Sequence, residues 1–103
     1  MAKYKIEWST DAKLDLYDIL EFYTKRNGNN AYSKKLYAKI SKSIALISQN
    51  PLIGTPTDYD SVRIVITGDY QILYEIHHKL LLIVFVWDCR RDPEDRKIEQ
   101  RLT

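Results

Sequence analysis

The last third of the chain carries the clearest alternation of apolar and polar positions. Three apolar runs, separated by turn residues at 68–69 and 77–79, span residues 62–66, 70–76 and 80–87. The first two runs alternate with period two, as strands with one buried face do. The third is apolar throughout, which is typical of a strand covered on both faces. Because the turns are short, the pattern predicts a three-stranded antiparallel meander.

The segments upstream of this meander predict one more strand and two helices. Residues 4–8 alternate as a half-buried strand does, and Ser9 or Thr10 is placed to cap a helix that ends at Asn27-Gly28. A second helix is expected from about residue 29 to residue 50, where Pro51 stops it. Residues 51–60 are expected to form a loop, and Pro93 suits the start of a short terminal helix.

Both predicted helices carry one apolar stripe, so they are expected to form an antiparallel hairpin over the sheet. The stripes consist of Ala12, Leu16, Ile19 and Tyr23 in the first helix, and Tyr32, Leu36, Ile40, Ile44 and Ile47 in the second. Asp15 and Asp18 are expected on the outer, solvated side of the first helix. The prediction is therefore an α+β two-layer domain with the order β-α-α-β-β-β, formed by residues 1–103 as a single unit.

Composition narrows the class of protein without specifying its function. A chain of 103 residues with 45% hydrophobic and 29% charged residues is sufficient for one folded domain. The net charge of +2 permits binding to nucleic acid or to an acidic protein segment but demands neither. A single cysteine, Cys89, and the absence of an apolar leader or a long apolar run predict a cytoplasmic protein without membrane contact.

Motif searches exclude several kinds of chemistry. The chain has no glycine-rich phosphate loop and no nucleophile elbow. His77 and His78 are adjacent, so in a strand they would point to opposite faces, and no other residues supply metal ligands at a suitable spacing. We therefore expect no metal and no cofactor, and we expect Cys89 to be a passive thiol rather than a reactive one.

Three arginines form the most promising candidate site. Arg63 lies in the first strand of the meander, and Arg90 and Arg91 follow the last strand. If Val62 and its even-numbered neighbours face the helices, Arg63 faces the side that the helices leave open, where three guanidinium groups could bind phosphate or carboxylate. The alternative is that these arginines form ordinary ion pairs, Arg63 with Glu75 and the other two with Asp88 or Asp92.

The order and spacing of these segments resemble the RelE/ParE superfamily of bacterial toxins, in the ParE-like, plasmid-stabilisation type. The resemblance is carried by the segments IEWSTDAKLDLYDILEFY, KISKSIALISQNPLIG, VRIVITGDYQILYEI and LLIVFVWDCRRDP. It implies the fold predicted above, and it implies a toxin of a type II toxin–antitoxin module that a cognate antitoxin neutralises.

The superfamily has two kinds of target, and the resemblance leaves both open. RelE-like members cleave ribosome-bound mRNA, and under that interpretation Arg63, Arg90 and Arg91 would be catalytic. The tyrosine that such members often carry near the C-terminus is missing, since no tyrosine follows Tyr74. ParE-like members inhibit DNA gyrase and need no catalytic base. The segment NPLIGTP and the strands after it favour this second target. A third possibility is a non-toxic module that binds a peptide.

A row of lysines in the second helix is the remaining candidate surface. Lys34, Lys35, Lys39 and Lys42 lie off its apolar stripe, and no acidic residue occurs between Asn27 and Thr57. Such a row is most often a solvated face. The resemblance adds a second interpretation, in which these four lysines meet an acidic tail of the antitoxin.

Overall fold

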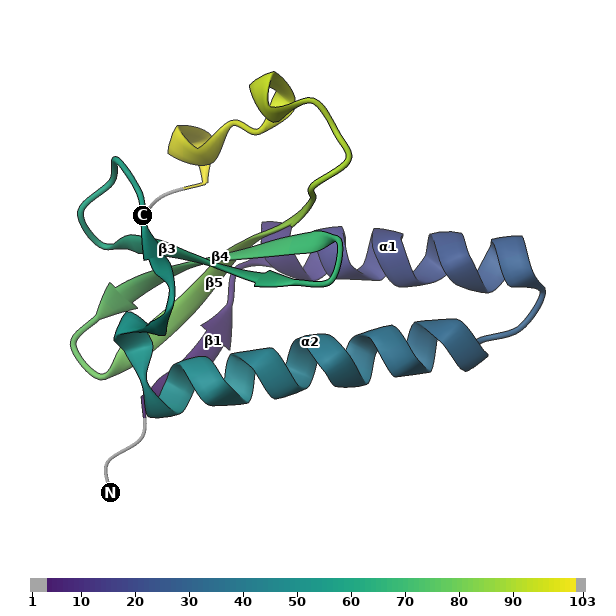
Figure 1. The fold of residues 1–103 in the computed structure, drawn as a ribbon, viewed down its shortest axis with the longest axis horizontal. Helices are drawn as coiled ribbons and strands as arrows, with labels where there is room; N and C mark the ends of the chain where they lie inside the picture. Colours follow the sequence, from purple (N-terminus) through teal and green to yellow (C-terminus); the bar gives the residue numbers. More distant parts are fainter. Residues whose placement is uncertain (1–3, 102–103) are drawn as a thin grey trace.

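The computed structural model describes residues 4–101 and has the predicted order of elements (Figure 1). Its strands and helices are β1 (Lys5–Trp8), α1 (Thr10–Asn27), α2 (Ala31–Gln49), β2 (Thr55–Pro56), β3 (Val62–Thr67), β4 (Tyr70–His77) and β5 (Leu80–Asp88). Three short 3-10 turns are η1 (Pro51–Ile53), η2 (Pro93–Asp95) and η3 (Ile98–Gln100). The predicted strand, helical hairpin and meander are therefore confirmed, and the expected terminal helix is replaced by two 3-10 turns.

The five strands form one mixed sheet in the order β1-β5-β4-β3-β2. The meander β3-β4-β5 is antiparallel, as predicted, whereas β1 runs parallel to β5. This parallel pairing arises because the helical hairpin forms the connection between β1 and the rest of the sheet. The segment predicted to be a loop contains β2, whose Thr55 and Pro56 pair with Ile64 and Arg63. The sequence-based prediction included neither β2 nor the parallel pairing of β1 with β5.

Helix ends follow local signals in the sequence. The Ser9 side chain accepts a hydrogen bond of 3.0 Å from the backbone N–H of Ala12, which confirms Ser9 as the N-cap of α1. Gly28 ends α1 in the left-handed conformation at φ 72°, where glycine is the favoured residue. Between the helices, the Ser33 hydroxyl donates to the carbonyl of Leu20, which fixes the hairpin near its turn.

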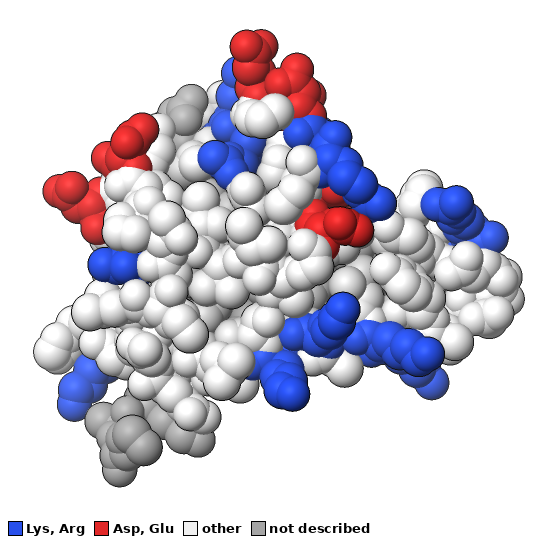
Figure 2. Space-filling view, in the orientation of Figure 1, with Lys and Arg blue, Asp and Glu red and all other residues white. Residues whose placement is uncertain are grey.

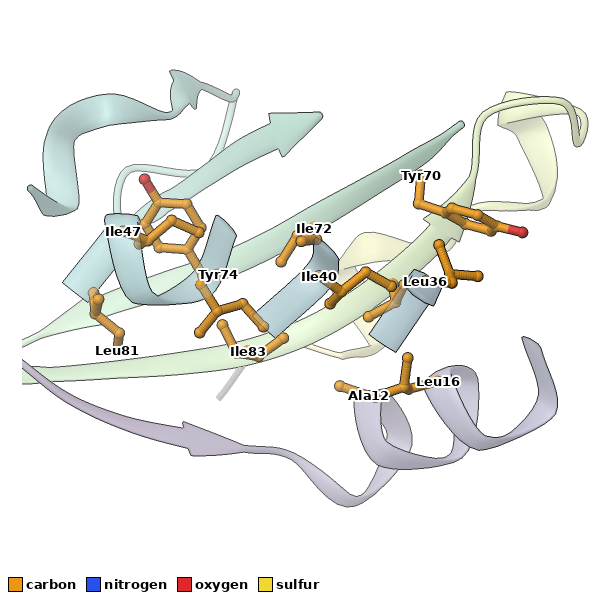
Figure 3. Packing of buried hydrophobic residues seen from close by; sticks show 12 residues of the cluster. Ala12, Leu16, Leu36, Ile40, Ile47, Tyr70, Ile72, Tyr74, Leu81 and Ile83 are labelled. Atoms are coloured by element: carbon orange, nitrogen blue, oxygen red, sulfur yellow. The ribbon is translucent and has the colours of Figure 1, made fainter. Parts of the chain in front are cut away.

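One face of the sheet packs against both helices and forms the main core (Figure 3). Its buried members include Ala12 and Leu16 of α1, Ile40 and Ile47 of α2, and Ile72 of β4. The predicted stripes are therefore confirmed, with one exception. The side chain of Tyr32 is 44% exposed because α2 extends here beyond the sheet, and its ring packs against the ring of Tyr23.

The opposite face of the sheet is also covered, which the sequence analysis did not predict. A second cluster on this face contains Val62, Leu73, Val84, Phe85, Trp87 and Ile98. Ile98 belongs to the C-terminal arm, defined here as residues 92–101, which crosses this face after β5 (Figure 1). The register of β4 and β5 shifts at Leu73/Tyr74, leaving Val84 as an extra residue in a bulge. As predicted, β5 is apolar throughout because both of its faces are buried.

Arg63 faces the helix side of the sheet, contrary to the sequence-based expectation. It lies opposite Tyr74 in the register of β3 and β4, whereas Val62 and Ile64 pack in the second cluster. Its guanidinium donates to the carbonyl oxygens of Gly54 at 2.7 Å and Leu52 at 3.2 Å. The predicted pair with Glu75 does not form, since Val62 is the residue opposite Glu75. Arg63 thus fastens the segment after α2 to the sheet.

Tyr74 fastens the same segment from within the core. Its hydroxyl donates to the carbonyl of Pro51 at 2.7 Å and accepts from the backbone N–H of Gly54 at 3.0 Å. A Cβ at position 54 would lie 2.6 Å from that hydroxyl oxygen, so only glycine permits the approach. Burial raises the pKa of Tyr74, which keeps the phenol protonated for the bond to Pro51.

We predict that Tyr74→Phe destabilises the fold by about 1–3 kcal/mol, because it leaves a buried N–H and a carbonyl without their partner. The measurement is urea unfolding, in which the midpoint should fall with little change in slope. Tyr17→Phe is the matched control, since the Tyr17 side chain is 61% exposed. Equal midpoints for the parent and Tyr74→Phe would contradict this account of the segment.

Candidate functional site

A hollow of about 350 Å³ lies between α1 and the end of the sheet from which the C-terminal arm departs. Phe22 and Tyr23 of α1 form one side, Tyr70 at the start of β4 forms the floor, and Arg90 and Arg91 follow from β5. These residues meet because the apolar stripe of α1 places Tyr23 over the position where Tyr70 pairs with Asp88.

Arg90 is held in place by an acidic and an aromatic partner. Its guanidinium donates to both carboxylate oxygens of Asp88 at 2.9 Å, in the two-pronged geometry that arginine favours with carboxylates. The same group donates to the hydroxyl of Tyr23 at 3.0 Å. These bonds hold the pKa of Asp88 below its ordinary value and raise the pKa of Arg90, so both remain charged. The predicted alternative, an Arg90–Asp88 ion pair, is confirmed.

The two tyrosines beside Arg90 differ in acidity. The Tyr70 hydroxyl donates to the Tyr23 hydroxyl at 3.2 Å. This bond, followed by the one from Arg90, lowers the pKa of Tyr23, because both donors stabilise its phenolate. Burial, followed by the bond to Tyr23, raises the pKa of Tyr70. Sequence reasoning missed this pair, because the two residues are far apart in the chain and belong to no spacing motif.

Asp15 and Arg101 close the edge of β5 next to the hollow. β1 pairs with β5 only as far as Ile83, so the following backbone groups on that edge need other partners. A carboxylate oxygen of Asp15 accepts from the N–H of Val86 at 3.1 Å. Arg101 donates to the carbonyl of Val84 and to both oxygens of Asp15. Asp15 is therefore a structural residue, and the expectation that it only solvates the helix was wrong.

The three candidate arginines do not converge on one site. Arg63 binds the carbonyl groups of the segment after α2, and Arg90 binds Asp88. Arg91 lies with its guanidinium carbon 4.5 Å from the centre of the Trp87 ring, a cation–π contact. Tyr74, opposite Arg63, is four residues along β4 from Tyr70, which corresponds to roughly 13 Å of strand. The phosphate site predicted from these three residues is not assembled.

The remaining sequence candidates have ordinary roles. Burial raises the pKa of the Cys89 thiol, which agrees with a passive cysteine. His77 makes a hydrogen bond of 2.7 Å to Glu75 at the end of β4. In the part of the chain that the structure describes, no group of three or more His, Cys, Asp or Glu residues could hold a metal. No helix among these residues is long and apolar enough to cross a bilayer.

The four candidate lysines are all exposed on α2. Figure 2 shows basic side chains along this helix without an acidic one among them. With 3.6 residues per turn, Lys35, Lys39 and Lys42 follow one line of the helix, and Lys34 is rotated away from that line. Three of the four candidate lysines therefore lie along one line of α2.

Comparison with known proteins gives one family. The model of the family described as the ParE toxin of the type II toxin–antitoxin system parDE matches residues 6–93. No curated protein sequence matches the chain. A solved chromosomal ParDE toxin–antitoxin system from P. aeruginosa is similar with a TM-score of 0.72 and 19% identity, over 84% of this chain and 96% of that one.

A second solved structure has the same fold. The toxin–antitoxin complex RelBE2 from Mycobacterium tuberculosis is similar with a TM-score of 0.63 and 22% identity. The match covers 84% of this chain and 99% of that one. Both structures support the β-α-α-meander arrangement derived above.

We predict that Arg90→Ala raises the pKa values of both Asp88 and Tyr23 toward their ordinary values of about 3.9 and about 10, because Arg90 is the main donor to Asp88 and, after Tyr70, the second donor to Tyr23. With the depressed pKa of Asp88, the ion pair stabilises the fold above that ordinary carboxyl value and loses its effect as the pH falls. NMR titration of the two side chains measures the change. Arg26→Ala, an exposed arginine of α1, should leave both values unchanged, and unchanged values in Arg90→Ala would contradict the network.

Proposed function

The chain belongs to the ParE toxin family of type II toxin–antitoxin systems, and from this premise we propose that it arrests growth by inhibiting DNA gyrase. A cognate antitoxin would hold it inactive. The match to the ParE toxin family supports the proposed inhibition of gyrase. The proposed antitoxin is supported by the similarity to two structures that were solved as toxin–antitoxin systems.

The dispersal of the three arginines is the observation that carries the gyrase target. Cleavage of RNA requires cations gathered around the reacting phosphate and a base beside the attacking hydroxyl. Here Arg63 is bound to backbone carbonyls, Arg91 to an indole ring and Arg90 to a carboxylate. Each positive charge already has a partner within the protein. This arrangement favours a toxin that acts by binding over one that acts by catalysis.

Cleavage of ribosome-bound mRNA remains the second candidate because of one observation. The chain lacks a tyrosine after Tyr74, but the fold places the Tyr23 hydroxyl 3.0 Å from the Arg90 guanidinium, with a lowered pKa. A phenol of lowered pKa beside a cation is a plausible pairing of base and phosphate ligand. Under this alternative Tyr23 and Arg90 would be the catalytic pair, and Arg63 would have no part in the chemistry.

Pulse labelling after induction of the chain alone separates the two targets. We predict that thymidine incorporation stops before amino-acid incorporation, because DNA synthesis depends on gyrase. A block of amino-acid incorporation first would contradict the gyrase proposal and support mRNA cleavage. Normal incorporation of both would support the non-toxic peptide-binding module.

Single substitutions at the hollow test the same choice independently. We predict that Tyr23→Phe retains the growth arrest within about threefold in inducer dose, because binding does not need an ionisable phenol, whereas loss of a general base costs about 10²–10⁴-fold in rate. Tyr17→Phe, on the outer face of α1, is the matched control. Loss of toxicity in Tyr23→Phe, with the fold intact by urea unfolding, would contradict the binding mechanism. Arg63→Ala is unsuitable here because it removes the hydrogen bonds of Arg63 to the carbonyl groups of Gly54 and Leu52, and is therefore expected to disturb the fold.

A further inference from the structure

Two neighbouring hollows lie where α2 covers the end of the sheet at β3, one apolar and one basic, and we treat them as the two halves of one groove. The apolar half, of about 570 Å³, is lined by Leu46 of α2, Ile53 of η1 and Ile66 of β3. The basic half, of about 310 Å³, is lined by Tyr32, Lys35 and Lys39 of α2 and by the turn between β3 and β4. Between the two halves, Thr67 donates a hydrogen bond of 2.7 Å to Ser43, which joins the strand to the helix. We call the two halves together the α2 groove.

The apolar half exposes side chains that the fold itself does not use. Leu46, Ile53 and Ile66 are 51%, 52% and 66% exposed, although they lie beside a core that is fully buried. Large apolar side chains gathered in one groove are typical of a surface that a partner covers. Scattered exposed apolar residues, such as Leu14 on α1, do not have this arrangement.

The edge of β3 beside the apolar half is open. β2 pairs only with Arg63 and Ile64, so Val65, Ile66 and Thr67 have no partner strand on that side among residues 4–101. An extended segment of another chain could pair with these residues in line with β2 and place alternate side chains into the groove. The open edge therefore favours an extended partner.

The basic half determines the charge of the partner. Lys35 and Lys39 line it, Lys42 continues the same line of α2, and no acidic residue occurs between Asn27 and Thr57. Asp69 also borders this half, but its carboxylate lies 3.9 Å from the guanidinium of Arg90, which partly offsets its charge. Carboxylates of a partner would find complementary charge here.

We propose that the α2 groove binds an extended segment of the antitoxin in which apolar residues fill the half at Leu46, Ile53 and Ile66, and acidic residues meet Lys35, Lys39 and Lys42. This inference rests on the proposed function, which supplies the antitoxin. It goes beyond that function by assigning the surface and the chemistry of the segment. It also narrows the predicted lysine row, since Lys34 lies off the groove.

The test measures binding of the full chain to the product of any short reading frame that adjoins its gene. Calorimetry compares the parent with Leu46→Asp, Ile66→Asp and the double variant Lys35→Glu with Lys39→Glu. Each should weaken binding by about tenfold or more, a loss common for a residue central to an interface. The double variant should also reduce the salt dependence of binding, because charge pairs at a surface are screened by salt.

Two control variants carry the same kinds of substitution at exposed positions outside the groove. Lys34→Glu reverses a charge on the same helix, and Leu14→Asp replaces an exposed apolar residue of α1. Both should bind within about twofold of the parent, as surface substitutions outside an interface do. Circular dichroism and urea midpoints check that every variant is folded, which the exposure of the substituted side chains favours.

The remaining outcomes overturn the inference in distinguishable ways. Parent and groove variants that bind the antitoxin equally would place the antitoxin elsewhere and leave the proposed function intact. A parent chain that does not bind this product would remove both the inference and the antitoxin part of the proposed function. Groove variants that abolish self-association without weakening antitoxin binding would identify a second copy of the chain as the occupant.

Discussion

Strand β5 is apolar from Leu80 to Trp87, and both of its faces are covered. The helical hairpin covers one face with the stripes of α1 and α2, and the C-terminal arm covers the other with Ile98. The bulge at Val84 places two consecutive side chains, Val84 and Phe85, in the second cluster before the alternation resumes toward Asp88. Arg90 follows the end of β5 and therefore lies beside Tyr23 and Tyr70. The position of the candidate site is therefore a consequence of how β5 is covered.

The same strand creates a second requirement at its edge. β1 is too short to pair with all of β5, so Asp15 and Arg101 bind the backbone groups of Val86 and Val84 instead. The ion pair between Arg101 and Asp15, at 2.7 Å, connects the arm to α1. The Arg101 guanidinium also lies 3.8 Å from the centre of the Phe85 ring. The arm thus belongs to the folded unit that frames the hollow, and it is more than a trailing segment.

Periodicity in the sequence was sufficient to predict the helices, the meander and most of the core, because period and burial are directly related. It could not place Arg63 or Asp15. The more apolar alternate set of β3, which includes Val62 and Ile64, packs in the second cluster, whereas the set with Arg63 and Val65 faces the helices. Apolar alternation alone therefore pointed to the wrong face. The role of Asp15 depends on an N–H far away in the chain. The pairing of Tyr23 with Tyr70 arises in the same way from tertiary packing, and so does the α2 groove.

We propose that this toxin acts by binding gyrase, with Arg63, Arg90 and Arg91 engaged in structural contacts. The most direct test adds the purified chain to purified gyrase and relaxed plasmid, and follows supercoiling with and without the antitoxin. We predict that the chain inhibits supercoiling and that the antitoxin restores it, with Tyr23→Phe as inhibitory as the parent. Unchanged supercoiling at a large excess of the chain, together with cleavage of mRNA on added ribosomes, would contradict it.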